Sequence, residues 1–211
     1  MRNILKNSLL YFIFSFVVLC SILYVLVYIS DYSPQQAFGF LTAGYPLTTL
    51  QAKFAFIINS LLFEICISWI IQYFSQSNEI LVCRFKGYKK TYRRLLYYVL
   101  LLNILYLIVT LLCLYLCSQV SFGKTVDYTF CPDGLLVLRS FFTYFLFIQI
   151  QIIFINLFSV KAAFSVHIIS LFLWIFLRNI SYELSTCALS VSLLGSTFYC
   201  YKSFCVRRKI W

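Results

Sequence analysis

Long apolar runs dominate the pattern along the chain, and short stretches containing charges, proline or glycine separate them. A bilayer core needs about 20 consecutive apolar residues per helix. The pattern therefore predicts an all-α polytopic membrane protein, with six transmembrane helices in one domain over residues 1–211. The predicted spans are residues 8–29, 54–74, 95–117, 140–158, 162–177 and 184–201.

The connections between these runs differ in length and character. The first run is too long for a signal-peptide core and lacks a small-residue cleavage site, so we expect an uncleaved signal anchor. Residues 31–53 contain two prolines and two glycines, which predicts a loop or a shallow interfacial segment on the outer side. The connection after residue 158 is short and predicts an antiparallel helix hairpin.

Composition limits the possible functions. The chain is 63% hydrophobic and 11% charged, whereas globular domains average about 25% charged residues. Six spans leave no room for a soluble catalytic domain, and the P-loop, H-E-x-x-H and G-x-S-x-G motifs are absent from the sequence. We therefore predict no enzyme activity, no cofactor and no catalytic residues.

Nine cysteines raise the question of metal or disulfide chemistry. Cys113 and Cys117 share a helix face, but no histidine or carboxylate pattern accompanies them, so we predict no metal site. Most of the cysteines lie within spans, where cysteine behaves as a small apolar residue. Cys117 and Cys131 are the two that could pair outside the membrane, and spacing alone leaves that disulfide open.

The basic residues are divided unequally between the two sides of the six-span arrangement. Thirteen of the 17 Lys and Arg residues fall on the side of both termini, against four on the other. The positive-inside rule assigns the basic side to the cytoplasm, so we predict a multi-pass plasma-membrane protein with cytoplasmic N- and C-termini. The net charge of +11 then reflects topology and contact with anionic lipids rather than nucleic-acid binding.

The strongly charged segment is residues 79–94, EILVCRFKGYKKTYRR, between the second and third spans. Its apolar residues recur at steps of three and four, which predicts a basic amphipathic helix lying in the membrane interface. Gly87 near its middle predicts a bend or break. The apolar stripe comprises Leu81, Phe85, Tyr88, Tyr92 and Leu95. Two functions remain open: a loop attracted to anionic headgroups, or a docking surface for a cytoplasmic partner.

A few polar residues lie inside the predicted spans, and we expect them to face the bundle rather than lipid. Glu64 lies near the middle of the second span, so it must be protonated, paired or facing water. A neutral acid hydrogen-bonded to Asn103 or Gln149 is slightly favoured over a role in transport. His167 has no obvious acid partner in the sequence and is expected to be a packing residue.

A resemblance is carried by Asn78 to Leu96, NEILVCRFKGYKKTYRRLL, lying between spans two and three. It resembles the small six-span permease subunits of Gram-positive ABC exporters, of the type-2 permease kind, including those encoded with peptide or bacteriocin transport systems. The match covers about one tenth of the chain. In that family the region meets the ATPase, which implies a docking surface made of Glu79, Arg84, Phe85, Lys86, Gly87, Tyr88, Lys89, Lys90, Arg93 and Arg94. The family usually has an amphipathic helix before the first span, and Met1 to Asn7 is too short for a long one.

These observations lead to two alternative functions. The first is the transmembrane subunit of an ATP-binding-cassette transporter, moving a peptide, lipid or other amphiphile with a separate ATPase subunit. The second is a small membrane immunity or sensor-accessory protein against antimicrobial peptides. The expected partners are the ATPase, anionic lipids and a homo- or hetero-oligomeric membrane subunit. Such a subunit could contact the small-residue face of Ala188, Ser192, Gly195 and Ser196.

Overall fold

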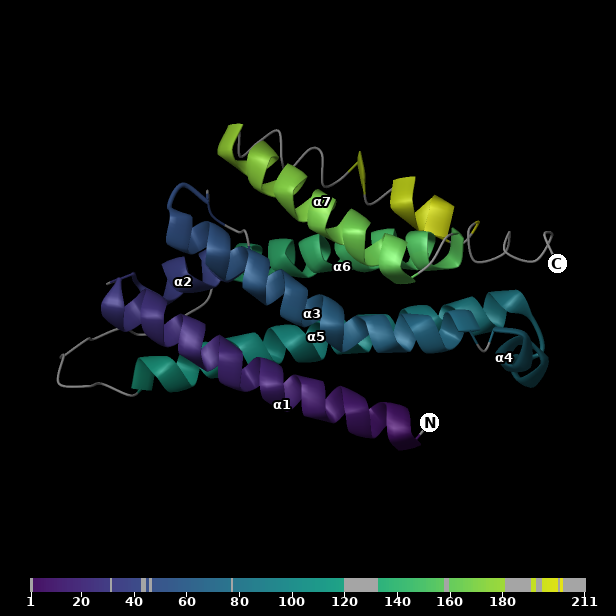
Figure 1. Ribbon diagram of the computed structural model, residues 1–211. Helices are drawn as coiled ribbons and strands as arrows, with labels where there is room; N and C mark the ends of the chain where they lie inside the picture. Colours follow the sequence, from purple (N-terminus) through teal and green to yellow (C-terminus); the bar gives the residue numbers. More distant parts are fainter. Residues whose placement is uncertain are drawn as a thin grey trace.

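The computed structural model describes residues 2–30, 32–42, 45, 47–76, 78–119, 133–157, 160–180, 191–192, 195–200 and 202. These residues are almost entirely helical, and none of them lies in a strand (Figure 1). The all-α prediction is therefore confirmed. The elements are α1 (Arg2–Tyr24), the π-helical turn η1 (Val25–Ile29), α2 (Pro34–Leu41), α3 (Leu50–Gln76), α4 (Asn78–Phe85), α5 (Tyr88–Gln119), α6 (Gly134–Leu157) and α7 (Val160–Ile180).

Three of the described helices are long and apolar enough to cross a membrane. They contain the segments Leu50–Phe74, Lys89–Cys117 and Gly134–Leu157, which coincide with the second, third and fourth predicted spans. Two shorter apolar helices, Ile13–Ile29 and Phe164–Phe176, fall on the first and fifth. Most of the sixth predicted span, residues 184–201, lies outside the described residues, as does Cys131. A membrane protein is thus supported by three helices of sufficient length.

The central helix of the bundle is α3, which packs against α1, α2, α5, α6 and α7. The long helices run antiparallel to their sequence neighbours, and α6 and α7 form the expected hairpin (Figure 1). Aromatic rings fill the centre, where Phe63 on α3 contacts both Tyr106 on α5 and Tyr144 on α6. The outer faces of the peripheral helices are apolar, as Phe14 and Phe172 illustrate, which suits contact with lipid.

Helix α2 corrects the prediction of a loop or shallow segment over residues 31–53. The Ser33 side chain accepts a hydrogen bond from the Gln36 backbone, and the Gln36 side chain accepts one from the Ser33 backbone. This capping box, with Pro34 in the first turn, starts a helix. Phe38 and Leu41 are completely buried. The segment is therefore part of the packed interior, and its proline starts a helix instead of marking a loop.

Candidate functional site

The basic segment forms an elbow, defined here as α4, the turn Lys86–Gly87 and the first two turns of α5. Lys86 and Gly87 have φ angles of 56° and 129°. The Gly87 amide donates to the Val82 carbonyl at 3.0 Å and the Lys86 amide to the Cys83 carbonyl at 3.4 Å. These two bonds are the Schellman pattern that ends a helix. The predicted break at Gly87 is confirmed. After it the chain continues as the long helix α5 rather than as a separate interfacial helix.

The elbow buries its apolar side between its two helices. Leu81, Tyr92 and Leu95 from the predicted stripe are buried, and they come from both α4 and α5. The Arg94 guanidinium lies over the Phe85 ring, 4.1 Å from its centroid, which ties the end of α4 to α5 through a cation–π contact. The predicted stripe therefore exists as the packed interior of the elbow rather than as one face of a single helix.

The opposite side of the elbow is exposed and basic. Glu79 and Tyr88 lie in the first turns of α4 and α5, and Phe85 is half-buried. The cations with exposed side chains are Arg84, Lys86, Lys89, Lys90, Arg93 and Arg94. Such a surface attracts acidic or anionic partners, and a lipid headgroup or an acidic protein surface would both satisfy it.

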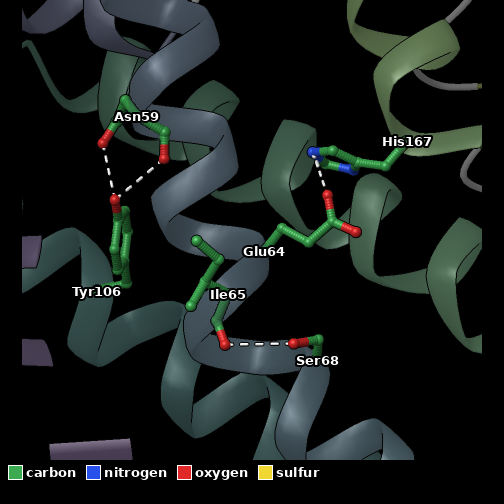
Figure 2. Close-up of polar contacts among 6 residues, drawn as sticks. All are labelled: Asn59, Glu64, Ile65, Ser68, Tyr106 and His167. Atoms are coloured by element: carbon green, nitrogen blue, oxygen red, sulfur yellow. Dashed lines mark hydrogen bonds and ion pairs between the residues drawn. The ribbon is translucent and has the colours of Figure 1, made fainter. Parts of the chain in front are cut away.

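Inside the bundle, Glu64 on α3 meets His167 on α7 (Figure 2). Glu64 Oε2 and His167 Nε2 are 3.0 Å apart, and the two side chains are 4% and 1% exposed respectively. The Phe147 ring on α6 packs edge-on against the imidazole, with centroids 5.2 Å apart. Gln151 is the hydrogen-bonding neighbour of the carboxyl group, and the Ser60 backbone lies beside the imidazole. Glu64 is therefore paired, which was one of the three expected conditions.

The partners expected for Glu64 from the sequence are wrong. Asn103 Nδ2 donates to the Phe141 carbonyl at 3.1 Å, and Gln149 accepts a hydrogen bond from Ser196. Both amides are buried, as expected, but each binds a different group. Ser192 and Gly195 of the predicted small-residue face are exposed, while Ala188 lies outside the described residues.

A second polar site is centred on Asn59 of α3, one of the polar residues within the predicted spans that were expected to face the bundle. Tyr106 donates to Asn59 Oδ1 at 2.8 Å (Figure 2). Asn59 Nδ2 donates to the Leu41 carbonyl at 2.9 Å. Tyr144 contacts the Asn59 amide and also donates to the Leu41 carbonyl at 3.2 Å. This Asn59 network joins the end of α2 to α3, α5 and α6. Its sequence signal was an asparagine inside the second predicted span, whereas no pattern in the sequence indicated Tyr106 and Tyr144 as its partners.

No group of three His, Cys, Asp or Glu residues within the described part of the chain could hold a metal ion. No family model matches the sequence, and neither the curated proteins nor the solved structures contain a match. The elbow and the polar residues inside the bundle are the features of the described residues that suggest a function.

Proposed function

We propose that this chain is the transmembrane subunit of an ATP-driven transporter, moving a peptide, lipid or other amphiphile with energy from a separate ATPase. In this proposal the chain crosses the plasma membrane six times, with both termini in the cytoplasm. The ATPase docks on the elbow, and its conformational changes are transmitted to the bundle through α5.

The observation that carries the proposal is the construction of the elbow. A loop that merely obeyed the positive-inside rule would need cations but no fixed shape. Here the turn is closed by two backbone hydrogen bonds, Leu81, Tyr92 and Leu95 are buried, and six cations remain exposed. The rigid connection to α5 also supplies a mechanical route, because α5 contacts α1, α3 and α6. A preformed basic surface of this kind favours protein docking over lipid attraction alone.

The arrangement of helix ends supports the proposed orientation. The beginning of α1 lies at the same end of the bundle as α4 (Figure 1). Arg2 and Lys6 at the beginning of α1 would therefore share a side with the cations of the elbow. The positive-inside rule favours the cytoplasm for that side.

Replacing Gly87 by alanine tests docking without changing charge. A Cβ at position 87 would meet no atom within 4 Å, so the substitution introduces no clash, but φ of 129° disfavours any residue with a side chain. Backbone strain of this kind costs about 1–3 kcal/mol, enough to shift the elbow toward other conformations. Gly134→Ala is the matched control, because its Cβ also meets no atom and its φ lies outside the positive region.

The measurement is recovery of an ATP-hydrolysing protein with the tagged chain from solubilised membranes of its host, at matched expression. We expect recovery with the wild type and with Gly134→Ala, and a loss of about fivefold or more with Gly87→Ala, following from about 1 kcal/mol or more of strain. Equal recovery with Gly87→Ala would leave the elbow as a lipid-facing surface. If the wild type recovers no ATPase, the transporter proposal is wrong.

A further inference from the structure

The Glu64–His167 pair stands apart from the other charged groups of the helices that surround it. The remaining charged residues of α3, α6 and α7 lie toward helix ends, and α5 carries none between residues 95 and 119. Other titratable side chains in the interior have different partners: Tyr106 and Tyr144 belong to the Asn59 network, and Cys66 contacts Ser15 on α1. The charged residues toward helix ends are Lys53, Arg139, Lys161 and Arg178.

The number of protons on this pair determines its net charge. With one proton, the pair is neutral, whether the proton sits on the carboxyl group or on the imidazole. With no proton the pair carries −1, and with two protons it carries +1. A net charge is costly in the apolar interior of a membrane protein. Glu64 Oε2 and His167 Nε2 lie 3.0 Å apart, so the charge on each group depends strongly on the charge of the other. The buried geometry therefore favours the singly protonated pair.

The pair also lies where a change in charge would move a helix. Helix α7 packs mainly against α6 and has fewer contacts with α3. Ser60 Oγ, one turn before Glu64, and His167 Nδ1 are both buried, with no hydrogen-bond partner among the described residues. Such polar atoms would gain hydrogen bonds if water entered between α3 and α7.

We infer that Glu64 and His167 together bind one exchangeable proton inside the bundle, and that α7 separates from α3 when this proton is lost or a second one is added. The proton comes from water and returns to water through the opened contact. The site does not require the ATPase and is independent of the proposed docking at the elbow.

The proton can be detected directly, because the chain contains a single histidine and ¹⁵N-histidine labelling yields one imidazole. The labelled protein in liposomes is studied by solid-state NMR between pH 5 and pH 8, and the protonated carboxyl band of Glu64 is identified by infrared difference against Glu64→Gln. We expect one of two results, each corresponding to a single proton on the pair: a charged imidazole without the carboxyl band, or a neutral imidazole with it. The protonation state should not change between pH 5 and pH 8. A neutral imidazole without the band, or titration near pH 6.5 like an exposed histidine, would refute the shared proton.

The coupling to α7 is tested with a cysteine at Leu171, one turn after His167 and 2% exposed. In a background without other cysteines, its reactivity toward a small maleimide is divided at each pH by that of the same cysteine in Glu64→Gln/His167→Gln, which keeps a polar contact without a titrating group. Because both thiols lie at the same buried site, this ratio removes the pH dependence of the thiol itself. We expect the ratio to rise severalfold at the acidic and alkaline extremes. A ratio that stays constant with pH would rule out the coupling.

Discussion

Replacing Asn59 by leucine should destabilise the bundle, because Asn59 connects α2 to three other helices. Leucine has the same number of side-chain heavy atoms as asparagine and a similar branched shape, so the change mainly removes hydrogen bonds, although its methyl groups need more room. The bonds lost are those from Asn59 Nδ2 to Leu41 and Tyr144, and that from Tyr106 to Asn59 Oδ1.

The expected magnitude follows from what each buried group retains. The Leu41 carbonyl still accepts a hydrogen bond from Tyr144 at 3.2 Å. The Tyr106 hydroxyl still donates a hydrogen bond to the backbone carbonyl of residue 59 at 3.1 Å. Neither group is left unpaired, so the cost is that of three ordinary hydrogen bonds within a membrane protein, at about 0.6 kcal/mol each. The total is about 2 kcal/mol, which corresponds to a decrease of about 4–8 °C in Tm for a chain of this size.

Thermal unfolding in detergent can be followed with a dye that fluoresces on reacting with thiols. Cys66 and Cys113 are completely buried, so their reactivity reports loss of the packed bundle. Tyr106→Phe should lower Tm by about half as much as Asn59→Leu, and the double variant should lose less than the sum because the two residues share a bond. Tyr97→Phe is the control, because it removes a hydroxyl group from a side chain that is 64% exposed. A Tm for Asn59→Leu equal to that of the wild type would show that the Asn59 network contributes no net stability.

Two further predictions concern α2 and the topology. Gly39→Ala should lower Tm strongly, since a Cβ there would lie 2.0 Å from the Tyr45 ring, whereas Gly134→Ala meets no atom and should leave Tm unchanged in the same thiol-dye assay. In a background without other cysteines, Thr48→Cys should react with an impermeant thiol reagent in intact cells, whereas Lys89→Cys should react only after lysis. Labelling of Lys89→Cys in intact cells would reverse the proposed orientation.

The long helices could be predicted because hydropathy alone specifies them, and the break at Gly87 because glycine is a poor helix former. The left-handed conformation of Lys86 could not be predicted, since lysine has no local preference for it; the Schellman bonds impose it. Helix α2 was missed because Pro34 and Gly39 are common in loops. The distinguishing signal was Ser33 followed three residues later by Gln36, which is a helix start.

The pairing of Glu64 with His167 depends on how α7 packs beside α3, which no local pattern encodes. The sequence nevertheless held a usable signal. Glu64 and His167 are the only charged or imidazole side chains within the predicted spans, and a buried acid in a membrane requires a partner. The same reasoning could not separate the amides, because Asn103 and Gln149 can each bind backbone or side-chain groups on any neighbouring helix.

The distance in sequence between the two members of that pair affects how the protein is made. Glu64 leaves the ribosome about 100 residues before His167, an interval of about 5–20 s at roughly 5–20 residues per second. During that interval α3 is in the insertion machinery or the bilayer while its partner helix does not yet exist. The acid must therefore enter in its neutral form or stay beside the insertion machinery, and a chain that stops before α7 would keep an unpaired carboxyl group in the membrane.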